Sequence, residues 1–285
     1  MSDSEISTYP KTPRNTVQRY RNLAKYDHHT IHSIINSSPF LHVSFNTPSP
    51  SDPFPALLPM IGFAGKYNPQ NPDEEDIGEG ANIYIHGYVS SRLMRMGKNA
   101  GEGEGGENNN VDNDDGEEKG LPMTVAATCL DGLVLALAPF NHNYNYRSAV
   151  IQGYGQVVED VDEKLWAMKK ITNTVHPTRW ENSRNPPTKT EMTTTQILRI
   201  HPHTGSSKLR RGGPPESKSD LKDLPLRERV WTGIIPVHLQ YGTPIAAEQC
   251  KVSEVPGYII NFVQERNKEG GEFAVRMAGE GEEGE

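Results

Sequence analysis

Residues 82–97 read NIYIHGYVSSRLMRMG, and their character changes halfway along. The first residues alternate apolar and polar side chains, which is typical of a half-buried β-strand. The alternation ends near His86, and a short helix is predicted to open on Ser90, Ser91 and Arg92. These side chains favour a bound phosphate, because a helix start leaves N–H groups unpaired and carries a partial positive charge. The alternative is that Ser90 only caps the helix and Arg92 lies in solvent.

Alternating segments recur along the chain and predict a mainly β fold. Asp131-Gly132 separates two of these segments and predicts a tight hairpin turn, because both residue types tolerate positive φ. We expect an antiparallel sheet that forms a β-barrel with a few peripheral helices. The expected strands cover residues 40–45, 56–61, 82–86, 123–130, 133–138, 149–158, 194–200 and 230–238.

Two peripheral helices have clear start signals. Asp27 is placed to cap a helix over residues 28–37, and Asp160 with Glu163 forms a D-x-x-E capping box for a helix over residues 161–175. Five apolar residues of the second helix recur at helical spacing and predict the face that packs on the sheet. They are Val161, Leu165, Met168, Ile171 and Val175.

Charge is unevenly distributed along the 285 residues. Residues 98–120 carry eight acids and two lysines, a net −6, and residues 279–285 carry four acids, a net −4. Since the whole chain has a net charge of −8, the remainder is about +2, which gives no sign of a nucleic-acid partner. We expect a flexible N-terminus at 1–14, one domain at 15–265 with a disordered acidic insertion at 98–120, and a flexible acidic tail at 266–285.

Neither a membrane partner nor a metal site is predicted. The chain has no apolar run of membrane-spanning length and no apolar signal region, which predicts a cytoplasmic protein. Its histidines at 28, 29 and 32 lack a neighbouring carboxylate or cysteine that would complete a metal site, so an exposed helix face is expected there.

Residues 141–148, NHNYNYRS, form a second unusual segment. Amides, aromatic rings, a histidine and an arginine at the mouth of a strand suit a flat heterocycle. The alternative is a loop whose amides satisfy its own backbone.

Four stretches resemble, in order and spacing, the pyridoxamine 5'-phosphate oxidase-related flavin-nucleotide-binding proteins of the nitroimidazole-resistance-like branch. These stretches are IYIHGYVSSRLMR, LDGLVLALAPFNHNYNYRSAV, GYGQVVEDVDEKLWAM and HPTRWENSRNPP. The resemblance implies an FMN-binding split β-barrel and a homodimer with FMN at the subunit interface.

The resemblance also assigns roles to individual residues. Ser90 and Arg92 fall on the positions of the phosphate ligands, and His86 or His142 are candidates for proton transfer. The cofactor-binding residues expected in this way are Pro59, Met60, Ile61, His86, Ser90, Ser91, Arg92, Tyr146, Arg147 and Ser148. Four further residues lie in matching stretches and are candidates to line the cleft: Arg179, Trp180, Lys208 and Arg210.

The implied function is an FMN-dependent oxidoreductase that uses NAD(P)H and a small electron acceptor. Vitamin B6 oxidation is disfavoured, because the W-x-x-x-R type signature of the true oxidases is absent after Val230. The alternative is a non-catalytic flavin-binding module or a haem-handling split-barrel protein.

Overall fold

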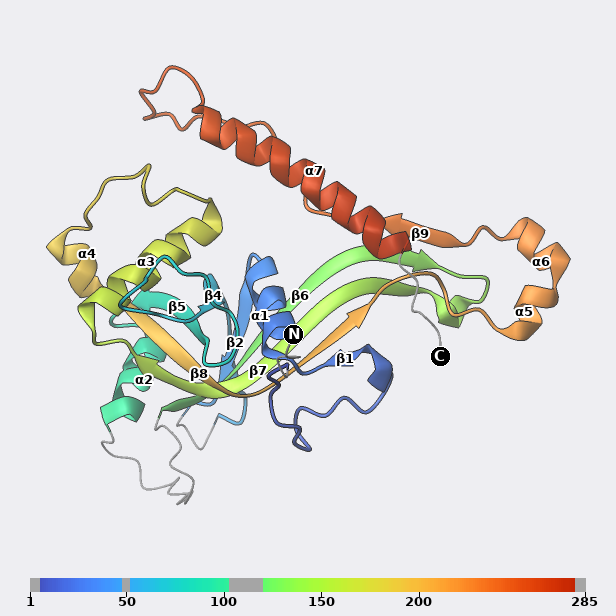
Figure 1. Cartoon of the computed structure of the whole chain (residues 1–285), viewed down its shortest axis with the longest axis horizontal. Coiled ribbons are helices and arrows are strands. Elements are labelled where there is room, and N and C mark those ends of the chain that lie inside the picture. Colours follow the sequence, from blue (N-terminus) through green and yellow to red (C-terminus); the bar gives the residue numbers. More distant parts are fainter. Residues whose placement is uncertain (1–5, 48–51, 103–119, 280–285) are drawn as a thin grey trace, which may run out of the picture. The chain divides into compact units, whose positions relative to one another are not determined.

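The computed structural model describes residues 6–47, 52–102 and 120–279 (Figure 1). Its helices are η1 (Arg21–Leu23), α1 (His28–Ser37), α2 (Arg92–Glu102), η2 (Pro139–Asn141), α3 (Val161–Val175), α4 (Lys189–Thr194), α5 (Lys218–Lys222), α6 (Leu224–Arg229) and α7 (Gly257–Gly279). Its strands are β1 (Ala24–Lys25), β2 (Leu41–Phe45), β3 (Ala56–Met60), β4 (Gly62–Gly65), β5 (Asn82–Tyr88), β6 (Leu121–Leu135), β7 (Asn143–Val157), β8 (Thr195–Arg210) and β9 (Gly233–Pro236).

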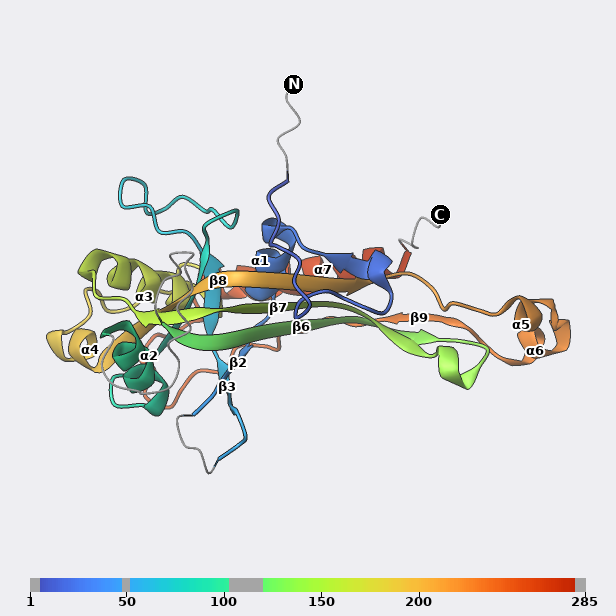
Figure 2. The same cartoon turned by 90° about the horizontal axis from the view of Figure 1, so that it is seen from below.

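The strands form one mostly antiparallel sheet that has to curl. Its order is β3-β2-β6-β7-β8-β5-β4, with β1 on β8 and β9 on β6, and Figure 2 shows β6, β7 and β8 side by side. The edge strands β3 and β4 lie at opposite ends of this order, yet only Ile61 separates them in the chain. Because one residue spans only about 3.5 Å, the end of β3 and the start of β4 must lie close together, so the sheet curls, although the two edge strands do not pair. The predicted mainly β, barrel-like fold with peripheral helices is confirmed.

The chain divides into two compact units, where the sequence predicts one domain over residues 15–265. The first unit comprises Met1–Thr128 and Ser148–Lys208, and the second comprises Cys129–Arg147 and Leu209–Glu285. Residues 266–279, predicted as flexible tail, form the second half of α7. Of the predicted insertion, residues 98–102 end helix α2, and residues 103–119 lie outside the described residues.

The core of the first unit covers both faces of β5. Ile83, Tyr84 and Ile85 are consecutive and fully buried, so this strand does not alternate at its centre. The Tyr84 ring stacks on Phe63 at 5.2 Å and meets the edge of Trp166 at 5.1 Å. Trp166, from α3, therefore seals one face of the sheet, and apolar burial of this kind dominates folding stability.

Helix α3 buries only part of the predicted stripe. Its buried residues are Glu163, Trp166, Ala167 and Ile171, whereas Val161 and Val175 are exposed. The stripe prediction is correct for Ile171, which is buried, and for Met168, which packs against the core, and it is wrong for Val161, Leu165 and Val175. The helix rotation differs because the large Trp166 ring packs on the aromatic residues of β4 and β5.

Both predicted helix caps are present. The Asp27 carboxylate accepts a hydrogen bond from the Thr30 N–H at 2.8 Å, and Asp160 accepts one from the Glu163 N–H at 2.7 Å. Glu163 uses its buried carboxylate elsewhere, accepting from the Tyr84 hydroxyl at 2.8 Å and from Arg199 at 3.2 Å. This network, rather than a complete capping box, ties α3 to the sheet.

The predicted hairpin turn at Asp131-Gly132 is wrong, because both residues lie inside the continuous strand β6. Asp131 is 3% exposed, and its two oxygens accept hydrogen bonds from Arg147 Nε and Nη2, both at 2.9 Å. Gly132 pairs with Pro236 of β9, and a Cβ there would lie 3.0 Å from an Ile234 methyl group. A charged partner on the neighbouring strand thus keeps Asp131 in the sheet.

The predicted exposed histidine face of α1 is correct for His29, which is exposed, and wrong for His28 and His32, which are buried. His32 Nδ1 lies 2.7 Å from the Ile77 carbonyl oxygen, so it must carry the proton. Its Nε2 then accepts from the Tyr9 hydroxyl, at 2.7 Å. Burial lowers the pKa of both histidines.

Candidate functional site

The connection between β5 and α2 starts the predicted site. Ser91 Oγ accepts from the Met94 N–H at 3.4 Å, and the Ser91 carbonyl accepts from the Arg95 N–H at 3.1 Å. Ser91 is therefore the helix cap, one residue later than the capping role considered for Ser90. This leaves the exposed Ser90 hydroxyl and the exposed Arg92 guanidinium outside the cap.

The helix start can accept an anion. The first N–H groups of a helix have no intrahelical acceptor, and within the described residues those of Arg92 and Leu93 are not among the groups satisfied by Ser91. Across the same described ranges, Arg92 forms no ion pair with a carboxylate. Two backbone donors, a hydroxyl and a guanidinium therefore remain available at one position.

The split of the barrel, where the edge strands β3 and β4 do not pair, lies beside the Gly62–Ile85 end of the β4–β5 ladder. Gly62 is the register partner of Ile85, so the residues that flank this pair, Ile61 and His86, end the ladder together. On the other side of the split, Met60 pairs with Leu41 of β2. The fold thus gathers residues 59–61, His86 and the start of α2 in the first unit, although they are up to 33 positions apart in sequence.

His86 has an unusual environment in this group. Its Nδ1 atom is buried and has no hydrogen-bond partner among the described residues. Burial lowers the pKa of His86. An unpaired buried nitrogen is costly, which makes it a candidate contact for a ligand.

The second predicted group, at the start of β7, is divided between the units. Tyr146 and Arg147 belong to the second unit and Ser148 to the first. The Arg147 guanidinium is engaged by Asp131 and also lies 4.5 Å from the centre of the Phe273 ring of α7. Ser148 Oγ donates to the Lys208 carbonyl at 3.3 Å. The Arg147 fork is therefore committed within the protein.

The candidate proton carrier His142 lies in the second unit and is exposed. Its Nδ1 accepts from the Ala136 N–H at 2.9 Å. The ring therefore serves the backbone of the loop that contains it.

Arg210 and Trp180, two of the four candidate cleft-lining residues, are held by contacts within the protein. Arg210 is buried and donates to the Asn145 amide oxygen at 2.5 Å and to the Gly213 carbonyl at 2.9 Å. The backbone N–H of Trp180 donates to Asn173 Oδ1 at 2.8 Å. Sequence reasoning missed Asp131, whose only signal was an arginine 16 positions later.

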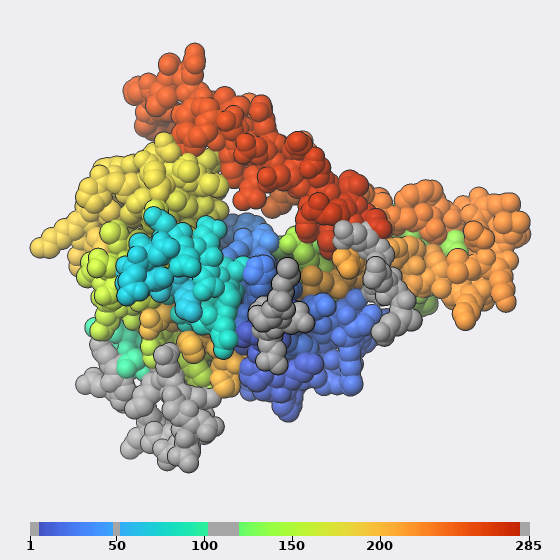
Figure 3. Space-filling view, viewed as in Figure 1, coloured from blue at the N-terminus to red at the C-terminus, as the bar shows by residue number. Residues whose placement is uncertain are grey.

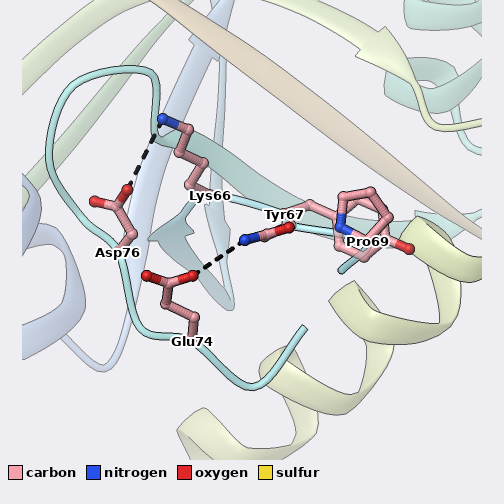
Figure 4. Close-up of a pocket in the computed structure, with 6 residues that line it drawn as sticks. Lys66, Tyr67, Pro69, Glu74 and Asp76 are labelled. Carbon is pink, nitrogen blue, oxygen red and sulfur yellow. Dashed lines mark hydrogen bonds and ion pairs between the residues drawn. The ribbon is translucent and has the colours of Figure 1, made fainter. Parts of the chain in front are cut away.

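The acidic loop between β4 and β5 is hollowed but internally paired. In the pocket of Figure 4, Lys66 reaches Asp76 at 3.9 Å and Asn68 donates to Glu74 at 3.1 Å. The Trp166 indole donates to the Pro72 carbonyl at 2.7 Å, which fixes the loop to α3. Figure 3 shows this cyan loop against the yellow segment that follows α3. We therefore place the candidate site at the β5–α2 connection instead.

Metal-binding clusters and membrane-spanning helices are not found in the part of the chain that the structure describes. Over these residues, no group of three or more His, Cys, Asp or Glu is arranged to hold a metal ion. Likewise, none of the helices in the described ranges is long and apolar enough to span a bilayer.

Comparisons with known proteins agree with this architecture. A profile of the pyridoxamine 5'-phosphate oxidase family matches residues 106–209. Among solved structures, a flavocytochrome from Azotobacter vinelandii is 25% identical, with a TM-score of 0.64, covering 88% of this chain and 97% of its own. A FAD- and haem-binding protein from Mycobacterium smegmatis is 22% identical, with a TM-score of 0.62, covering 84% of this chain and 97% of its own. A search of curated proteins found no match.

A more distant structure is a candidate 5-nitroimidazole antibiotic resistance protein from Bacteroides thetaiotaomicron, at 14% identity and a TM-score of 0.42, covering 65% of this chain and 85% of its own. The fold is that of the flavin-binding split-barrel proteins. More particularly, the chain carries a pyridoxamine 5'-phosphate oxidase-like region, as its sequence motifs predict.

Proposed function

We propose that the protein is an FMN-binding oxidoreductase that takes hydride from NAD(P)H and passes electrons to a small acceptor. The observation that carries the proposal is that Ser90 and Arg92, at the start of α2, are exposed and have no side-chain partner among the described residues, in a fold shared with flavin proteins. A bound flavin supplies the hydride and electron-transfer chemistry, while the protein supplies binding, position and electrostatics.

The start of α2 holds the phosphate of the cofactor. The Arg92 guanidinium offers two parallel donors, and Ser90 and the first N–H groups of the helix add neutral ones. The backbone of residues 59–61 borders the flavin ring, as the family resemblance implies. With this division, Ser90, Arg92 and the start of α2 would hold the charged end of FMN, and residues 59–61 would border its flat end.

His86 is the residue we assign to proton transfer. Because burial lowers its pKa, its imidazole is neutral at pH 7 and has one donor and one acceptor nitrogen. Its unpaired Nδ1 is one of these two atoms. His142 is the weaker candidate, since its Nδ1 is already occupied by a backbone N–H.

The active form is a cytoplasmic homodimer with FMN at the subunit interface, as the resemblance implies. Tyr146 and Ser148 are retained as cofactor contacts. Arg147 takes part through its pair with Asp131, because its guanidinium is already engaged.

A second candidate is a flavin protein that also carries haem. Two solved structures align with 88% and 84% of the length of this chain; one is a flavocytochrome and the other is a FAD- and haem-binding protein. His86, whose buried Nδ1 has no partner among the described residues, is one candidate for a haem iron ligand, because neutral imidazole is a common iron ligand.

The visible spectrum of the purified protein tests both candidates. A flavin band, with FMN or FAD released on denaturation, supports flavin binding, and an additional Soret band supports the second candidate. Anaerobic mixing with NADH and with NADPH should bleach the flavin band; an unbleached band would leave a binding module without turnover. A colourless protein that ignores added FMN and FAD would refute the proposal.

A further inference from the structure

The N-terminal segment of the first unit is a basic and aromatic surface. Residues 9–26 contain five cationic residues and three tyrosines but no acid. All five cationic residues are exposed: Lys11, Arg14, Arg19, Arg21 and Lys25. The segment lies on the surface in Figure 3, where it is dark blue. Positive charge interleaved with aromatic rings suits phosphate-bearing, flat ligands.

This surface is rigidly attached although it is mostly irregular. Asn15 is 4% exposed and donates through its amide to the carbonyl oxygens of Pro10 at 2.9 Å and Gly205 at 3.0 Å. The buried Tyr9 bonds to His32, and Ala24 pairs with Lys208 of β8. The cationic side chains thus extend from a backbone that is hydrogen-bonded to the first unit, so the backbone itself need not be ordered when they bind a ligand.

Tyr20 is the most exposed of the three tyrosines of this surface, and two cationic groups lie over its ring. Its backbone is left-handed, with φ 55° and ψ 59°, and the residue is 55% exposed. The Arg19 guanidinium lies 4.9 Å from the ring centre, and the Lys208 ammonium lies 5.3 Å from it. A left-handed tyrosine is strained and is often found where function needs the side chain in one place.

The charges of this surface have no acidic partner. Among the described residues, none of the five cationic residues nor Lys208 forms an ion pair, whereas Lys66, Lys169 and Lys170 on the acidic loop side all do. Arg21 donates only to Gln18, through its side-chain and backbone oxygens. The positive charge is therefore available for an anion.

We propose that Tyr20, Arg19, Arg21 and Lys208 bind the adenosine diphosphate part of a dinucleotide. The purine stacks on the exposed Tyr20 ring, and the two phosphates are bound by the surrounding cationic groups. The site rests on the proposed function, because FAD and NAD(P)H both contain this group. It is also adjacent to a predicted flavin contact, since Ser148 donates to the Lys208 carbonyl.

Titration with ADP tests the site directly. The wild type should bind ADP, and the double variant Arg19→Ala/Lys208→Ala should bind it about tenfold or more weakly, because two charge-assisted contacts are lost. Tyr20→Asn should also bind ADP about tenfold more weakly, and asparagine is chosen because it tolerates the left-handed backbone. Tyr20→Trp, which keeps an aromatic ring for stacking, should bind ADP about as tightly as the wild type. Arg229→Ala, an exposed cation on α6, is the control and should bind ADP as the wild type does.

The source of the group is decided with intact cofactors. If it belongs to FAD, the variants lose FAD affinity and keep FMN affinity; if it belongs to NADPH, they lose NADPH affinity and keep both flavins. No ADP binding by the wild type, or losses no larger than for Arg229→Ala, would overturn the site. Equal weakening of ADP and of an unrelated polyanion such as heparin, with no effect of Tyr20→Asn, would also overturn it. FMN binding is measured in parallel, so failure of this site and failure of flavin binding are distinguishable.

Discussion

Arg92 and Arg147 are both assigned to the same flavin by the family resemblance, but their environments are opposite. Arg92 is exposed at the start of α2 and, among the described residues, forms no ion pair. The Arg147 side chain is 18% exposed and gives two guanidinium nitrogens to Asp131 at 2.9 Å each. An arginine with its partner inside the chain stabilises the fold, whereas one without a partner is free for a ligand.

Histidines of the first unit show the same contrast. His32 is fully buried and both of its nitrogens are paired, to Tyr9 and to Ile77. His86 has a buried Nδ1 without a partner in the described ranges. Among the described residues His28 Nδ1 of α1 is also buried without a partner, so it is the position of His86 beside the start of α2, together with its unpaired nitrogen, that makes it the candidate.

Removing the charge of Asp131, the partner of Arg147, should have the largest effect on stability. Asp131→Asn leaves the half-buried Arg147 without its counter-charge, and we expect a loss of about 3 kcal/mol in the free energy of unfolding. Urea unfolding followed by circular dichroism measures this loss. The exposed Glu228→Gln is the control in the same unit. A loss of less than about 1 kcal/mol, typical of an exposed pair, would show that Arg147 is free for a ligand.

Removing the Arg92 side chain should weaken cofactor binding and leave the fold unchanged. Arg92→Ala should cost about 1.5–3 kcal/mol of FMN binding free energy, the range for a hydrogen bond to a charged group. Fluorescence titration with FMN measures the loss, and Arg95→Ala, one turn further along α2, serves as control. Unchanged FMN affinity in Arg92→Ala would place the phosphate elsewhere.

The saturated histidine should make stability depend on pH. Burial lowers the pKa of His32 in the folded state, while the unfolded value is about 6.5. At a pH above the unfolded pKa, His32 is neutral in both states. As the pH drops below that value, only the unfolded state binds the proton, so the free energy of unfolding decreases until the pH reaches the lower pKa of the folded state. We expect His32 to contribute a loss of about 1 kcal/mol between pH 7.5 and 5.5.

Urea unfolding at the two pH values checks this contribution. His32→Gln should lower stability at both values but reduce its change with pH, and the exposed His29→Gln should keep the wild-type change. Equal pH dependence in His32→Gln and the wild type would contradict a buried, neutral His32.

An exposed ion pair between the acidic loop and α3 should show the smallest effect. Lys169 and Asp73 are 3.1 Å apart, but the Asp73 side chain is 81% exposed. Asp73→Asn should therefore cost less than about 1 kcal/mol, and the cost should shrink in high salt. A larger, salt-independent loss in urea unfolding would mean that this loop is part of the core.

Local signals in the sequence by themselves determined much of the fold. The caps at Asp27 and Asp160, the helix after β5 and most strand positions are predicted correctly, because each depends on neighbours within a few residues. The family motifs also predicted the split barrel and the pyridoxamine 5'-phosphate oxidase-like region.

Only the tertiary structure decided which polar groups are occupied. The sequence predicts Asp131 as a turn residue, but in the structure it pairs with Arg147 of the neighbouring strand. It predicts Glu163 as a capping residue, but the Glu163 carboxylate accepts from Tyr84, 79 positions away in the chain. His32 reads as exposed until Ile77 and Tyr9 enclose it. The physical reason is that hydrogen bonding and desolvation depend on partners brought together by folding, which spacing along the chain does not encode.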